Sequence, residues 1–227
     1  MTEKPRRRRS GWARAGRWAF ILIGFGIIAV GAAPELLAWP YRAERGSTIV
    51  YSNAPIPPQI DTVLARTDAL LATSPLNRPL AGRRIFLTGG GWRWPLLALT
   101  SSGAFALRRP YRDAIIVNRA DVAADRVSNG AEIGGTRSLS GTLAHEFTHV
   151  LVARRYGEFR AARIESWRSE GYADHVAQES SLSDGDYRRL RASGADHPAL
   201  RYYEGRRRVE ALLRANNGDP DRLFGGE

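Results

Sequence analysis

The chain has 227 residues, enough for one domain with a buried core and too few for two large domains. Its 43% hydrophobic and 25% charged residues indicate a globular protein, and the absence of cysteine excludes disulfides, a thiol nucleophile and cysteine-ligated metal sites. The net charge is +11, but no nucleic-acid-binding motif accompanies it, so we expect no nucleic-acid partner.

The N-terminal 39 residues combine a basic segment with an apolar one. Residues 1–17 contain seven basic side chains and predict a cytoplasmic tail, whereas residues 18–39 contain Glu35 as their single charged side chain. As a helix, residues 18–39 would measure about 33 Å, against a hydrocarbon core of about 30 Å. This length predicts a transmembrane anchor; the shorter run to Ala33 also suits a cleaved signal peptide. In both cases the rest of the chain lies on the exported side, periplasmic or extracellular, of a single-pass arrangement.

The segment from residue 40 begins with short strand-like elements. Residues 40–59 are rich in proline and indicate a linker or an irregular first strand around residues 48–51. Apolar positions at helical spacing predict a helix over 59–73. Runs of β-branched and aromatic residues predict strands over 84–88 and 114–118, with a third over 103–107.

From residue 138 onward the pattern is mainly helical. Apolar periodicity predicts helices over about 138–155, 165–180, 184–193 and 198–216. Strands followed by helices are typical of an α+β domain, so we expect a small mixed sheet and a mainly helical C-terminal half within 60–227.

Residues 145–149 read His145-Glu146-Phe147-Thr148-His149, the H-E-x-x-H pattern. Histidines four positions apart lie on one face of a helix, so both imidazoles can reach one zinc ion. The carboxylate of Glu146 lies about 100° further round, where it can act as a general base instead of a ligand. Apolar residues centred on the opposite side would pack on the domain: Leu143, Phe147, Val150 and Leu151.

A third ligand follows within Glu170-Gly171-Tyr172-Ala173-Asp174. Glu170 comes 21 positions after His149, which leaves room for the first helix to end and a second to return beside it. Asp174 lies one turn after Glu170 and can hold the outer nitrogen of a ligating histidine. The expected metal ligands are therefore His145, His149 and Glu170, with Asp174 supporting them.

The two motifs together resemble the gluzincin zinc metallopeptidases, in particular the small peptidase-MA-like domains related to thermolysin and aminopeptidase N. The resemblance covers about residues 60–215 and implies a zincin-like fold, a zinc cofactor and a peptide or protein substrate. It implies a substrate-pairing edge strand, for which residues 114–118 are the candidate. It also implies a tyrosine that stabilises the tetrahedral intermediate, for which we choose Tyr203 before Tyr202.

Two alternatives to a membrane-anchored metallopeptidase stay open from the sequence. One is a non-catalytic, zinc-stabilised module that binds peptide or envelope components, although such a site has no need of Glu146. The other is a zinc hydrolase of a non-peptide amide, because specificity lies in loops that follow no motif. We expect the remaining histidines, His175 and His197, to be structural or exposed.

Overall fold

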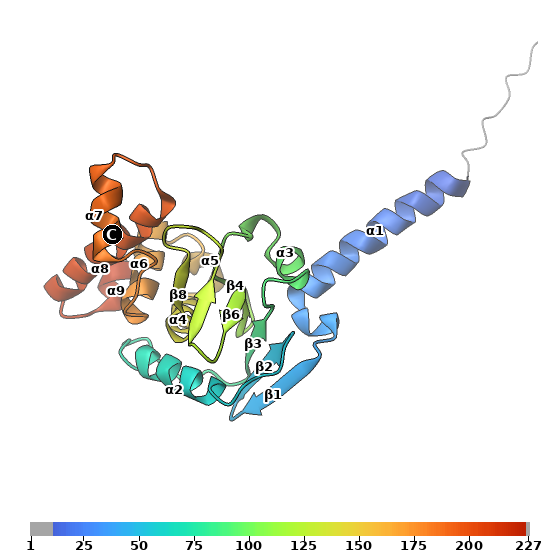
Figure 1. Ribbon diagram of the computed structural model, residues 1–227, viewed down its shortest axis with the longest axis horizontal. Coiled ribbons are helices and arrows are strands. Elements are labelled where there is room, and N and C mark those ends of the chain that lie inside the picture. The colour runs from blue at the N-terminus through green and yellow to red at the C-terminus, as the bar shows by residue number, and fades with distance from the viewer. Residues whose placement is uncertain (1–10, 226–227) are drawn as a thin grey trace, which may run out of the picture. The chain divides into compact units, whose positions relative to one another are not determined.

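In a computed structural model of the chain, residues 11–225 are described (Figure 1). The chain forms two compact units, an N-terminal one that ends at Ala38 and a larger one that begins at Trp39. Residues 1–10, which hold most of the predicted basic tail, lie outside the described residues.

The N-terminal unit consists of helix α1 (Gly11–Ala32) and the 3-10 turn η1 (Pro34–Leu37). The single helix that we predicted over 18–39 is wrong in its bounds. It ends at Ala32 because Pro34 disfavours the helical conformation at Ala33, whose φ and ψ are −135° and 79°. The predicted transmembrane anchor is not found, since no helix within residues 11–225 is both long enough and apolar enough to cross a membrane.

The larger unit is built on a five-stranded sheet with the order β1-β2-β3-β5-β4. Its inner strands β2 (Thr48–Ser52), β3 (Arg83–Leu87) and β5 (Ala114–Val117) run parallel. The edge strands β1 (Tyr41–Arg45) and β4 (Ala106–Arg109) are antiparallel to their neighbours.

Of the two alternatives for residues 40–59, the first strand around residues 48–51 is present as β2 (Thr48–Ser52). Strands β1 and β2 pair as a hairpin across Gly46 and Ser47, and Gly46 takes the positive φ of 55° that such a two-residue turn requires. The proline-rich composition hid this hairpin, because the prolines lie before and after the strands.

The predicted strand at 114–118 is present as β5, but it is not an edge strand. β5 lies between β3 and β4, and all four of its residues are buried. A strand buried on both faces is uniformly apolar, and that explains its sequence. The edge on this side of the sheet belongs to β4.

Helices α2 (Ile60–Leu71) and α4 (Leu139–Tyr156) share the main hydrophobic core with one face of the sheet. The predicted apolar stripe of α4 is confirmed, because its four residues are at most 3% exposed. From the sheet, Val50, Ile85 and Ile115 join the same core. Phe86, from the middle of β3, stacks on Tyr51 and contacts Trp39.

Short elements connect the sheet to α4. Helix α3 (Arg93–Ala98) and the turn η2 (Leu99–Ser101) precede β4. A three-stranded antiparallel sheet follows β5, formed by β6 (Arg119–Asp121), β7 (Arg126–Ser128) and β8 (Thr136–Ser138). We did not predict this second sheet, since strands of three residues give no readable alternation. β8 leads directly into α4 and thereby fixes where that helix begins.

The C-terminal half is helical, as predicted. It contains α5 (Glu158–Ala161), α6 (Ser166–Val176), α7 (Asp184–Ala192), α8 (Pro198–Ala215) and α9 (Pro220–Phe224). The mixed α/β class with a small sheet is therefore confirmed.

Helices α6 and α8 cross in close contact at two glycines. A Cβ atom built on Gly171 would lie 2.5 Å from the carbonyl oxygen of Gly205, which is closer than real Cβ contacts allow. Helix α6 therefore needs glycine at position 171, despite a cost of about 1 kcal/mol for glycine within a helix, and a Cβ on Gly205 would lie 3.1 Å from the Trp167 carbonyl oxygen. This contact fixes which residues of α8 lie beside Glu170 of α6.

Candidate metal centre

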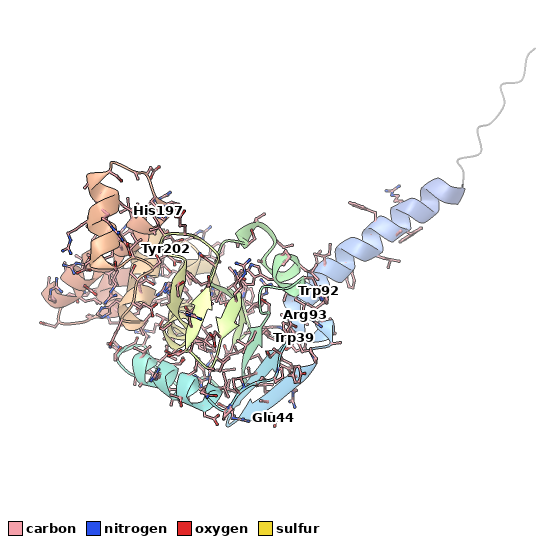
Figure 2. The ribbon with its side chains drawn as sticks, in the orientation of Figure 1. Trp39, Glu44, Trp92, Arg93, His197 and Tyr202 are labelled. Carbon is pink, nitrogen blue, oxygen red and sulfur yellow. The ribbon has the colours of Figure 1, made fainter. Side chains whose placement is uncertain are left out.

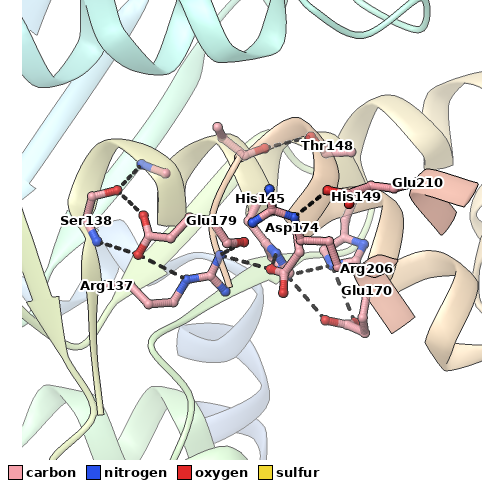
Figure 3. Close-up of polar contacts among 12 residues, drawn as sticks. Arg137, Ser138, His145, Thr148, His149, Glu170, Asp174, Glu179, Arg206 and Glu210 are labelled. Atoms are coloured by element: carbon pink, nitrogen blue, oxygen red, sulfur yellow. Dashed lines mark hydrogen bonds and ion pairs between the residues drawn. The ribbon is translucent and has the colours of Figure 1, made fainter. Parts of the chain in front are cut away.

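Helix α4 presents two histidines from a rigid, capped segment. Ser138 caps its start, accepting a hydrogen bond from the Gly141 N–H at 3.0 Å. Gly157, with φ of 87°, follows its end. His145 and His149 lie one turn apart on this helix, and their Nε2 atoms are 3.2 Å from each other (Figure 3).

Glu170 joins the two histidines from α6. Its Oε2 lies 3.2 Å from His145 Nε2, and its Oε1 lies 3.5 Å from His149 Nε2. One ligand atom from each of the three residues lies within 4.8 Å of the others. The structure thus brings together the three residues that we predicted as metal ligands.

The spacing of these atoms suits a tetrahedral metal ion. Zinc–ligand distances of about 2.0–2.2 Å place neighbouring ligand atoms about 3.3–3.6 Å apart. The two imidazole nitrogens are 3.2 Å apart, and each lies 3.2 or 3.5 Å from a different oxygen of the Glu170 carboxylate, at or next to this range. Two imidazoles and one carboxylate are also a donor set that zinc accepts.

The outer nitrogens of both histidines have partners that orient the rings. His145 Nδ1 lies 2.8 Å from Asp174 Oδ1, as predicted for Asp174. His149 Nδ1 lies 3.2 Å from the Ser169 hydroxyl. Donation from Nδ1 to the Asp174 carboxylate leaves Nε2 of the neutral imidazole free to bind a metal.

Arg137 supports Asp174 from strand β8. One of its terminal nitrogens lies 2.9 Å from Asp174 Oδ1 and donates to the Glu179 carbonyl oxygen at 3.2 Å. Asp174 is fully buried; burial raises its pKa, but the charge of Arg137 and the contact with His145 outweigh this and lower it overall. We did not identify Arg137 from the sequence. A buried carboxylate needs a cation, but the sequence does not say which of the chain's many arginines supplies it.

The carboxylates around His145 favour its protonated form. Burial lowers the pKa of this imidazole, but hydrogen bonds with Asp174 and Glu170 raise it to about 10. Conversely, burial raises the pKa of Glu170, while the charges of His149 and His145 hold it well below its usual value. Because the pKa of His145 is higher in the folded than in the unfolded chain, its protonation adds to the free energy of unfolding of the protein without metal. This contribution is complete below the ordinary pKa of about 6.5 and is lost as the pH rises through about 10.

Metal binding should therefore release a proton. A ligating Nε2 must be deprotonated, so we expect about one proton released per metal ion at pH 8. The apparent affinity should rise by up to about tenfold per pH unit between pH 7 and pH 9. Titration calorimetry in buffers of different ionisation enthalpy measures this release; a binding enthalpy that is the same in all buffers would contradict it.

Glu146 is half-buried next to His145, and its carboxylate has no hydrogen bond or ion pair within the part of the chain that the structure describes. Its negative charge contributes to raising the pKa of the Tyr202 hydroxyl. The carboxylate is therefore available for proton transfer beside the cluster.

The structure distinguishes the two candidate tyrosines. Tyr203, our first choice, stacks on Tyr187 at 4.2 Å and donates its hydroxyl to Asp184 at 2.6 Å. These two contacts join α8 to α7, and Tyr203 does not line the groove beside Glu170. Tyr202, labelled in Figure 2, lines a groove together with Glu170. Burial raises its pKa, and the charges of Glu170 and nearby carboxylates raise it further.

A groove of about 510 Å³ opens beside Glu170 between α6 and α8. Aromatic, basic and acidic side chains line it together, and its walls are Ser166, Trp167, Glu170, Pro198, Arg201, Tyr202, Glu204, Gly205 and Arg208. Glu170 is shared by the groove and the three-residue cluster, so the groove borders the candidate metal centre at this residue.

The other two histidines have structural roles. His197 caps α8, accepting a hydrogen bond from the Ala199 N–H at 3.3 Å. His175 Nδ1 lies 3.9 Å from Glu210, and its ring contacts Tyr172. Neither belongs to the metal-ligand cluster.

No protein-family model matches this chain, and no curated protein or solved structure matches it either. Its function must therefore be inferred from the chemistry of these residues.

Proposed function

We propose that this protein is a zinc-dependent hydrolase of the gluzincin type and that it cleaves peptide bonds. The observation that carries the proposal is the convergence of His145, His149 and Glu170 within 4.8 Å, with the unpaired carboxylate of Glu146 one residue from a ligand. The ligands come from two helices, α4 and α6.

The ligand set favours a catalytic over a structural zinc site. Three protein ligands leave one coordination position open, whereas structural sites are closed by four. Bound zinc would polarise the scissile carbonyl and make the attacking water more acidic. Asp174, held by Arg137, keeps the His145 ring oriented for this role.

The remaining chemistry belongs to Glu146 and Tyr202. Glu146 accepts a proton as water adds to the carbonyl carbon, and it returns that proton to the amine nitrogen as the C–N bond breaks. The Tyr202 hydroxyl donates a hydrogen bond to the oxygen that becomes negative in the transition state. Its raised pKa keeps the phenol protonated at neutral pH, as this role requires.

Strand β4 is the element that would hold the peptide backbone. Within the described residues β4 pairs with β5 alone, so its other edge is free to accept an extended peptide as an additional strand. Phe105, just before β4, contacts the Arg137 guanidinium, so this end of the strand lies near the residues that support the metal centre.

Metal analysis and peptide cleavage test the proposal together. The purified chain should contain about one zinc per molecule and cleave members of a peptide library. Chelation should abolish the cleavage, and added zinc should restore it. A protein without bound metal would overturn the proposal, and one zinc without cleavage of any peptide would favour a binding module. Export of residues 40–227 stays a prediction from the N-terminal arginines.

A further inference from the structure

We propose that the groove beside Glu170 binds a carboxylate of the substrate through Arg201 and Arg208, so that the enzyme prefers peptides with an acidic group near the cleaved bond. This inference rests on the proposed function and specifies its substrate class. The carboxylate belongs either to an aspartate or glutamate side chain or to the free C-terminus of the peptide.

Both acidic residues of the groove are already engaged. Glu170 faces the two histidines at 3.2 and 3.5 Å. Glu204 accepts a hydrogen bond from the Tyr187 hydroxyl at 3.2 Å, and its Oε1 lies 3.4 Å from the Arg191 guanidinium. Neither carboxylate pairs with the two arginines that line the groove.

Those two arginines keep their hydrogen-bond donors available. Arg201 makes no ion pair or side-chain hydrogen bond within residues 11–225. The Arg208 guanidinium lies 3.7 Å from the centre of the Trp167 ring, a cation–π contact that holds it in place. A guanidinium stacked in this way still presents N–H groups at its edge, where a carboxylate can accept two of them.

The position of the groove connects these arginines to the reaction. Arg201 is adjacent to Tyr202 on α8, and both line the groove together with Glu170 of α6. A substrate whose scissile carbonyl lies at the metal cluster therefore has its neighbouring residues within the groove. With the acidic residues engaged, the unpaired charge there is positive, which favours a carboxylate over a neutral or basic side chain.

The cleavage arm of the test uses fluorogenic peptides that differ at one position. In the first series the C-terminus is amidated, and one position around the cleaved bond is glutamate, glutamine or lysine. In the second series the peptides have no acidic side chain but a free C-terminus. We expect kcat/KM to be about tenfold higher for the carboxylate-bearing peptide than for its neutral isostere. The series that shows the preference identifies whether the bound carboxylate is a side chain or a C-terminus.

Single-residue variants test whether the preference for acidic peptides depends on the groove. Arg201→Gln and Arg208→Gln should each lower kcat/KM for the acidic peptide by about tenfold and leave the neutral peptide within about twofold. Arg201→Glu should shift the preference toward lysine. Arg207→Gln removes the same charge from the residue before Arg208, which does not line the groove, and is the matched control. Equal loss for all peptides, or an equal effect of Arg207→Gln, would overturn the proposal.

A binding arm separates this inference from the proposed hydrolysis. Trp167 lines the groove, so its fluorescence should report the binding of an acidic tetrapeptide to the metal-free protein. Binding that depends on Arg201 without any cleavage would support the groove and contradict the hydrolase. Cleavage without preference for a carboxylate, and without Arg201-dependent binding, would support the hydrolase and overturn the groove.

Discussion

Glu146→Gln should lower kcat/KM for peptide hydrolysis by about 10²–10⁴-fold while the protein keeps its zinc, because a glutamine side chain cannot accept the proton of the attacking water. Glu146 has no structural partner among the described residues, so the substitution should leave the fold intact. The measurement is kcat/KM on a cleaved peptide, paired with zinc content and the thermal unfolding midpoint.

A matched substitution controls for the loss of a negative charge. Glu44 lies on β1, 61% exposed and far from Tyr202 in Figure 2, and Glu44→Gln should leave kcat/KM unchanged. Full activity of the Glu146→Gln enzyme with zinc bound would refute the base role of Glu146. Loss of zinc from this variant would instead make Glu146 a ligand, contrary to the separation of roles that we propose.

Glu170→Gln should weaken zinc binding by at least about 100-fold. Replacing a residue that only supports a ligand typically costs 10–100-fold in affinity, and this change removes the single anionic ligand itself. Glutamine keeps the shape of the side chain, so the contact of α6 with α8 at Gly171 and Gly205 should survive. Competition against a fluorescent zinc chelator measures the dissociation constant directly.

Stability gives an independent measure of the same loss. Zinc at 100 times the wild-type Kd should add about 2.7 kcal/mol to the free energy of unfolding of the wild-type protein. A variant with a 100-fold weaker site should gain about 0.4 kcal/mol at the same zinc concentration. Glu44→Gln should match the wild type. Equal zinc stabilisation of the Glu170→Gln protein would exclude Glu170 as a ligand.

Helix geometry explains which features of the site were predictable from the sequence. The spacing of His145 and His149, the apolar stripe behind them and the caps at Ser138 and Gly157 all depend on contacts within about one turn of one helix. Local rules therefore determine them wherever the helix lies. The return of Glu170 was also predictable, because the intervening residues provide an end for the first helix and a start for the second.

The N-terminal strands and the strand order were decided by pairing over long sequence distances. Ala114–Val117 reads as a strand, but its interior place depends on pairing with both β3 and β4. The sequence offered β2 as one of two alternatives, whereas its hairpin with β1 and its parallel pairing with β3 appear only in the structure. Periodicity describes one strand at a time and contains no information about its neighbours.

By itself, the sequence determined the class of the fold, the helix that carries both histidines, and the residue types that a metal would need. The tertiary structure alone decided that Tyr202 and not Tyr203 faces Glu170, and that Arg137 supports Asp174. Consecutive residues on a helix point about 100° apart, so the rotation of α8 against α6 selects between the tyrosines. That rotation is set by the contact of Gly171 with Gly205, two residues 34 positions apart whose meeting no local pattern encodes.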